Sequence, residues 1–172
     1  MKFLIGIFFV LISGFCVFGQ KSVADLKPNH AAALEEFLSK NKNYGFMNEK
    51  VIESEDLKFM RQYLDKTLAP FYNTGDYNKD GVADFALVLS RKVSPKKAKD
   101  GDYFIHSLSV MIFNGIKKGG FSKPFIEDVE VPLKCFIRLS DEKKKVLYFG
   151  VIETDADTRK FTPVGKSYVV KY

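Results

Sequence analysis

The chain has 172 residues, 46% of them hydrophobic and 28% charged, and a formal net charge of +6. Its length fits one domain with a core large enough to fold alone, and no repeat or linker divides it. The positive charge lies in short groups between apolar runs, which predicts solvated turns and excludes the contiguous basic face with stacking aromatics that nucleic acids need. These groups are Lys96–Lys97 with Lys99, Lys117–Lys118 and Lys143–Lys145.

The first residues have the pattern of an export signal. Met1-Lys2 precede an apolar run from Phe3 to Ile12, and Val17-Phe18-Gly19 places small or tolerated residues where a signal peptidase reads. Ser13-Gly14 interrupt the apolar stretch, which is short for a membrane span of roughly 20 residues. We therefore expect residues 1–19 to be a signal peptide. Residues 20–172 would form a single periplasmic or secreted domain with no stable membrane span.

The two cysteines bear on lipid attachment and on disulfide bonding. Cys16 could carry a lipid anchor, but bulky Phe15 before it argues against this, because lipoprotein processing favours a small residue there. Loss of Cys16 with the signal would leave Cys135 without an intramolecular partner, so a bound metal could replace a disulfide as a staple. Cys135 alternates with apolar residues between Val131 and Leu139, which predicts a buried, inert thiol.

The part of the chain after the signal predicts two helices. Asn29 can cap a helix that runs to about Lys40. Ser54 can cap a second helix, which Pro70 ends. Apolar residues recur at helical spacing in both segments, namely Leu34, Phe37 and Leu38 in the first and Leu57, Met60, Leu64 and Leu68 in the second.

From Pro70 onward the apolar pattern alternates, which indicates strands. Asn114-Gly115 predicts a tight hairpin turn, because both residues tolerate positive φ. The connections are too short for crossover helices, so we expect an α+β fold in which two N-terminal helices pack on a mainly antiparallel sheet of about five to six strands. The predicted strands are Phe71–Tyr72, 83–92, 103–113, 131–139, 146–152 and 167–171.

Between the first two predicted strands, residues 76–84 carry an oxygen-bearing side chain at alternate positions around Gly81. Ca²⁺ takes six to eight oxygen ligands, which a loop supplies from alternate side chains, a backbone carbonyl and water. The alternative is that Asp80-Gly81 makes an ordinary turn and the acids face water. The pattern favours a calcium site with side-chain ligands Asp76, Asn78, Asp80 and Asp84 and the carbonyl of Val82.

Other metals fit this loop less well. Mg²⁺ demands near-octahedral geometry and sheds water reluctantly, and zinc or iron prefers nitrogen or sulfur, which only His30, His106 and Cys135 could supply. The twelfth position counted from Asp76 is Leu87, so the bidentate glutamate of an EF-hand is absent. We expect a weak, structural calcium site with a dissociation constant of about 10⁻⁴–10⁻³ M, as in extracellular modules.

Two candidate catalytic groups remain. His106 could approach Cys135 across the sheet as a base and nucleophile, but a lone histidine on an apolar face is more often a hydrogen-bonded core residue. Glu153, Asp155 and Asp157 alternate near a strand end and could form a second cation site or an acid pair, although a solvated turn is the commoner outcome. We assign no catalytic residue.

Residues Gly75–Leu87 resemble the repeat unit of FG-GAP and VCBS proteins, whose strand-loop-strand pattern holds calcium in integrin-type propellers. The likeness covers about thirteen residues and occurs once, whereas a propeller needs several repeated blades. Together with the helical part before Pro70-Phe71-Tyr72, the order is similar to that of small exported bacterial proteins that carry this loop once. The resemblance implies a compact fold with one calcium loop.

Two classes of function follow from the sequence. The favoured hypothesis is a monomeric, non-enzymatic envelope domain, stabilised by Ca²⁺, that binds another protein or a glycan through an exposed sheet face or loops. The alternative is a small hydrolase that acts on an envelope polymer with acids such as Glu153 and Asp155.

Overall fold

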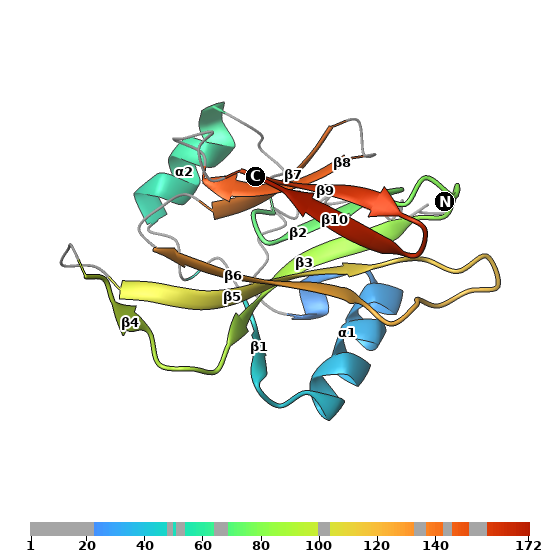
Figure 1. The fold of residues 1–172 in the computed structure, drawn as a ribbon, viewed down its shortest axis with the longest axis horizontal. Coiled ribbons are helices and arrows are strands. Elements are labelled where there is room, and N and C mark those ends of the chain that lie inside the picture. Colours follow the sequence, from blue (N-terminus) through green and yellow to red (C-terminus); the bar gives the residue numbers. More distant parts are fainter. Residues whose placement is uncertain are drawn as a thin grey trace, which may run out of the picture.

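A computed structural model describes residues 23–47, 50, 54–63, 69–99, 104–132, 137–142, 146–151 and 158–172. Within these ranges the chain forms two sheets, a short 3-10 helix at Val23–Asp25 and the α-helices α1 (Pro28–Lys40) and α2 (Ser54–Tyr63) (Figure 1). All the strand pairs of the described residues are antiparallel, as the short connections predicted.

The larger sheet has six strands and is built around β3 and β5. On one side β3 pairs with β1 and β2, and on the other it pairs with β5, where Leu87 lies opposite Met111. β5 also pairs with β6 and β4. The strands are β1 (Tyr44–Phe46), β2 (Tyr72–Gly75), β3 (Asp84–Arg91), β4 (Lys96–Lys97), β5 (Phe104–Phe113) and β6 (Phe125–Pro132).

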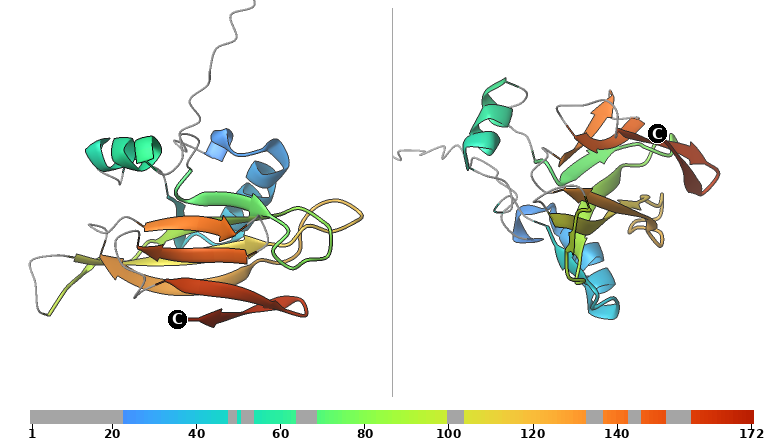
Figure 2. Two further views of the ribbon diagram at one scale, coloured as in Figure 1. Left: turned by 90° about the horizontal axis from the view of Figure 1, so that it is seen from above. Right: turned by 60° about the vertical axis from the view of Figure 1, so that its left-hand side comes forward.

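The smaller sheet has four strands in the order β10-β9-β8-β7, so among the described strands β10 pairs only with β9. Gly165, with φ +61°, lies in the turn between β9 and β10. Figure 2 shows this C-terminal hairpin at the free edge of the sheet. The strands are β7 (Ile137–Glu142), β8 (Val146–Val151), β9 (Arg159–Val164) and β10 (Ser167–Lys171).

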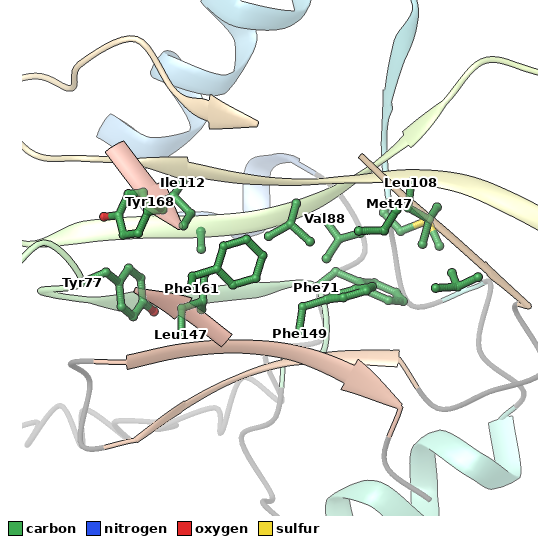
Figure 3. Packing of buried hydrophobic residues seen from close by; sticks show 14 residues of the cluster. Met47, Phe71, Tyr77, Val88, Leu108, Ile112, Leu147, Phe149, Phe161 and Tyr168 are labelled. Carbon is green, nitrogen blue, oxygen red and sulfur yellow. The ribbon is translucent and has the colours of Figure 1, made fainter. Parts of the chain in front are cut away.

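The two sheets pack face to face over a buried core (Figure 3). Alternate residues of β3 and β5 supply one side of this core, and β8, β9 and β10 supply the other. Since successive side chains of a strand point to opposite faces, the intervening residues must be buried elsewhere. The facing residues are Ala86, Val88, Leu108, Val110 and Ile112 from the larger sheet and Leu147, Phe149, Phe161 and Tyr168 from the smaller sheet.

Helix α1 covers the other face of the larger sheet (Figure 1). Leu34 from the helix is fully buried among the remaining side chains of the central strands, which include Phe85, Leu87, Leu89, Met111 and Phe113. The order of layers is therefore helix, six-stranded sheet, four-stranded sheet. This explains why residues 84–89 of β3 are buried on both faces.

The predicted α+β fold with two helices on one sheet is wrong. The protein is mostly β, and among the described helical side chains only those of α1 pack on the larger sheet, because the second sheet takes the face that a further helix would have covered. Among the described side chains of α2, none belongs to either buried cluster. Residues 131–139 were expected to form one strand, but β6 ends at Pro132 and β7 begins at Ile137, in a different sheet.

The predicted tight turn at Asn114-Gly115 is also wrong. Gly115 continues beyond β5 and forms an isolated bridge with Phe121, so the chain reverses later. The residues with positive φ in this connection are Gly119 at +95° and Gly120 at +79°.

In the part of the chain that the structure describes, no helix has both the length and the apolar character needed to cross a membrane. The predicted signal peptide and Cys16 lie outside the described residues.

Candidate metal site

The loop that joins β2 to β3 contains the predicted calcium ligands and lies beside the β5–β6 connection (Figures 1 and 2). Gly75 pairs with Asp84 in register, which closes the base of the loop. Lys79 and Gly81 have positive φ values of 62° and 83°, so the backbone coils tightly at these two positions. This coiling brings the side chains on either side of it back onto the loop backbone.

Asp76 and Asn78 converge on one backbone group. The N–H of Asp80 lies 3.0 Å from Asp76 Oδ1 and 3.0 Å from Asn78 Oδ1. Asp76 Oδ2 also accepts the N–H of Gly81 at 3.1 Å. Both side chains therefore turn into the loop.

Asp80 completes this inward arrangement. Its Oδ1 accepts the N–H of Val82 at 2.9 Å, and its Oδ2 lies 3.1 Å from Asn78 Nδ2. Such bonds are typical of Asx turns and explain the shape of the loop without an ion. The three side chains that alternate in the sequence are nevertheless neighbours in space, as the calcium prediction requires.

Asp84 lies deeper than the other loop acids and is fully buried. Its Oδ2 accepts the N–H groups of Tyr77 at 2.8 Å and Asn78 at 3.2 Å, and its Oδ1 accepts the N–H of Gly115 at 2.8 Å. The pKa of Asp84 is raised, mainly because burial disfavours the charged carboxylate. The hydrogen bonds from Gly115, Asn78 and Tyr77 oppose this rise, and the negative charge of Asp80 adds to it. Through its three hydrogen bonds, Asp84 holds the start of the loop to the chain that follows β5.

Two residues after β5 support the loop from outside it. A Cβ on Gly115 would lie 2.4 Å from the carbonyl oxygen of Ala83, so only glycine permits this approach. Asn114 Oδ1 accepts the hydroxyl of Tyr168 at 2.5 Å, which connects the loop to β10 of the smaller sheet. Burial raises the pKa of Tyr168, and the negative charges of Asp84, Asp80 and Asp76 raise it further.

Sequence reasoning missed these supporting residues. It interpreted Asn114-Gly115 as a turn and made no assignment for Tyr168. The hydrogen bonds that reveal their roles join residues 31 and 54 positions apart, and no local pattern indicates such pairs.

The chemistry of the loop fits a hard cation. Asp76, Asn78 and Asp80 offer carboxylate and amide oxygens, Val82 offers a carbonyl, and Asp84 Oδ1 retains one acceptor position after its single hydrogen bond. No ion pair of the described residues involves a loop acid. Among the residues that the structure describes, no three His, Cys, Asp or Glu side chains form a metal site by themselves. A site here would therefore need the amide and the carbonyl as well.

The other predicted candidates are not brought together. His106 lies half-buried on β5, whereas Cys135, Glu153, Asp155 and Asp157 lie outside the described residues.

A polar network on the larger sheet contains a serine hydroxyl bonded to an acid, but this serine is not accessible. Ser109 donates to Asp128 at 2.6 Å, and Asp128 also pairs with Arg91 at 2.9 Å. Ser109 is fully buried, so its hydroxyl cannot meet a substrate in this structure.

Comparisons of the chain with protein-family models, with curated proteins and with solved structures give no match. A proposal for its function therefore depends on the geometry and chemistry of its own residues.

Proposed function

We propose that residues 76–84 bind Ca²⁺ and that the ion has a structural role in an exported, non-enzymatic domain. The side chains of Asp76, Asn78 and Asp80 and the carbonyl of Val82 would bind the ion. Asp84 would contribute through Oδ1 while its other hydrogen bonds keep the loop on the sheet. A bound ion would supply positive charge that offsets the repulsion among the carboxylates.

The observation that carries this proposal is the convergence of Asp76 and Asn78 on the N–H of Asp80, each at 3.0 Å. A turn stabilised by Asp80-Gly81 alone would not require acids at positions 76 and 84 as well. Three carboxylates in one loop without an ion pair among the described residues repel one another at neutral pH. A divalent cation that binds only the folded loop would stabilise the native state.

This site joins three parts of the fold. The loop belongs to β2 and β3, Gly115 follows β5, and Tyr168 of β10 bonds to Asn114. Calcium would therefore stabilise the end of the sandwich at which the larger sheet meets the C-terminal hairpin. The exposed surfaces of the domain would then bind a protein or glycan partner.

Thermal unfolding with and without calcium tests the proposal. With a dissociation constant of about 1 mM, 10 mM Ca²⁺ should stabilise the native state by about 1.4 kcal/mol. Asp80→Asn preserves the size of the side chain but removes its charge, so the variant should lose most of the calcium-induced rise in melting temperature. Differential scanning fluorimetry and calorimetric titration measure the two effects.

The matched control is Glu35→Gln, which removes one exposed negative charge from α1, away from the loop. This variant should retain the full response to calcium, and 10 mM Mg²⁺ should produce a much smaller response than Ca²⁺. An identical melting curve of the wild type in calcium and in chelator would contradict the proposal, and so would an undiminished calcium response of Asp80→Asn.

A further inference from the structure

The C-terminal hairpin, residues 159–171, has a distinct composition. Its strands and turn contain Arg159, Lys160, Lys166 and Lys171 and no acidic residue. On the larger sheet, by contrast, two basic residues pair with acids, Arg91 with Asp128 at 2.9 Å and Lys96 with Glu130 at 2.7 Å. No ion pair of the described residues involves a cation of the hairpin.

Side chains alternate between the two faces of β9 and β10, so some of these basic residues point away from the core. Phe161 of β9 and Tyr168 of β10 are buried between the sheets. Their neighbours in each strand point to the opposite face because side chains alternate. The exposed residues on that face and its turn, which we name the outer hairpin face, are Lys160, Val164, Gly165, Lys166, Ser167, Val169 and Lys171.

Two lysines of this face lie opposite each other on neighbouring strands. Lys171 lies directly opposite Lys160 in the β9–β10 register, and like charges in such a pair are destabilising. Lys160 Nζ lies 5.7 Å from the centroid of the Tyr148 ring on β8, which holds this cation over the sheet. The arrangement costs stability in the free protein, and an anionic surface would relieve the cost.

Apolar side chains lie among these lysines. Val164 is 57% exposed and Val169 is 46% exposed. In the part of the chain that the structure describes, β10 is also an edge strand, which leaves the backbone groups of its outer edge without a partner strand. Exposed valines lie between lysines that form no ion pair with a described residue, so this surface is both apolar and basic.

We propose that the outer hairpin face binds the surface of a membrane that contains anionic lipids. The lysines would contact the phosphate and carboxylate groups of the lipids, and Val164 and Val169 would enter the boundary between headgroups and acyl chains. A nucleic acid or an acidic polysaccharide would satisfy the lysines but would leave the valines in water. Tyr148 is not an open stacking platform for bases or sugars, because Lys160 lies over its ring. The inference does not depend on calcium binding.

Flotation with vesicles tests this inference on residues 20–172, the domain expected after removal of the predicted signal peptide. The protein should bind vesicles of phosphatidylcholine with 30% phosphatidylserine and should not bind pure phosphatidylcholine. Binding should weaken as salt is raised, since salt screens charges at the surface. The double variant Lys160→Gln with Lys171→Gln should bind about 30-fold more weakly. Val169→Thr should weaken binding about fourfold by removing one methyl-sized apolar group.

The matched control is Lys42→Gln with Lys92→Gln, which removes the same charge from exposed positions beside β1, in the larger sheet and not in the hairpin. It should bind within about twofold of the wild type, and all variants should keep the wild-type circular dichroism. Equal losses from both double variants would show a response to net charge alone and would overturn the inference. Binding to heparin or RNA but not to the anionic vesicles would overturn it as well, and so would a failure to bind any vesicle.

Discussion

At the scale of single residues, His30 shows how a polar side chain can be accommodated in an aromatic core. It is the third residue of α1 and is buried, with its ring stacked on Phe85 at 4.3 Å. Its Nδ1 lies 2.7 Å from the hydroxyl of Tyr72 on β2. Burial, together with the charge of Lys27, lowers the pKa of His30 to about 4. The neutral imidazole is therefore the form that fixes α1 to the sheet.

We expect this histidine to make the protein less stable in mild acid. Between pH 6.5 and about 4 the unfolded chain binds a proton at His30 and the native protein does not, so stability falls as the pH falls through this window. The loss should approach roughly 3 kcal/mol at pH 4. Urea unfolding at pH 7 and pH 4.5 should show a much smaller pH dependence for His30→Phe than for the wild type.

His106→Gln is the control for this measurement, because it removes the other histidine of the chain from its half-buried position on β5. It should keep the pH dependence of the wild type. If His30→Phe loses stability between the two pH values as steeply as the wild type does, the assignment to His30 is refuted.

At the scale of elements, the β2–β3 loop depends on the chain that follows β5. The N–H of Gly115 donates to Asp84 Oδ1 at 2.8 Å. Because Gly115 has no Cβ, its backbone can lie close to Ala83 and Val82. The two hairpins thus meet backbone to backbone. A shift of either one would disturb the positions of the loop carboxylates.

Gly115→Ala should therefore lower both stability and calcium affinity. The added methyl group would lie 2.4 Å from the Ala83 carbonyl oxygen, so the backbone must move, at a cost of about 2 kcal/mol or more. Gly120→Ala in the same connection meets no atom within 4 Å and suffers only from its positive φ of 79°.

Melting temperatures with and without calcium distinguish these two variants. Gly115→Ala should have a reduced calcium-induced shift, whereas Gly120→Ala should melt at a lower temperature but shift as much as the wild type. Equal calcium shifts for both variants would show that the close approach at Gly115 does not hold the loop in shape.

At the scale of the whole molecule, the two sheets are held together mainly by apolar packing, with a polar link at the end that carries the loop. Tyr168 belongs to the core between the sheets, and its hydroxyl donates to Asn114 after β5. Because this bond is buried, removal of the hydroxyl leaves the amide oxygen without that donor.

We predict that Tyr168→Phe lowers the free energy of unfolding by about 1–2 kcal/mol while the ring keeps its place in the core. Tyr172→Phe removes a hydroxyl from a side chain that is 82% exposed and should change stability by less than about 0.5 kcal/mol. Chemical denaturation measures both values. Equal, negligible effects of the two substitutions would argue that the link between the sheets contributes nothing.

Local pattern was enough to predict several elements of this fold. Helical spacing predicted the helix that the structure shows at Pro28–Lys40, but the predicted cap is wrong, because Asn29 lies inside the helix and Lys27 precedes it without a side-chain cap. Alternation predicted β3 and the bounds of β10 at Ser167–Lys171. The side chains of β3 alternate as a strand requires, since Phe85 and Leu87 face α1 while Ala86 and Val88 face the second sheet. Alternation fails for β6 and β9, where Glu127, Asp128 and Pro163 interrupt the apolar pattern, and neither strand was predicted as it occurs.

The amino-acid sequence by itself determined where oxygen-bearing side chains alternate around Gly81 and which residues of the central strands are apolar on both faces. Only the tertiary structure decided that a second sheet covers one of those faces, that Asp84 bonds to Gly115, and that Tyr168 reaches Asn114. The physical reason is the range of the interactions. Backbone geometry and side-chain periodicity act over a few neighbouring residues, whereas these contacts form only when packing brings distant strands together.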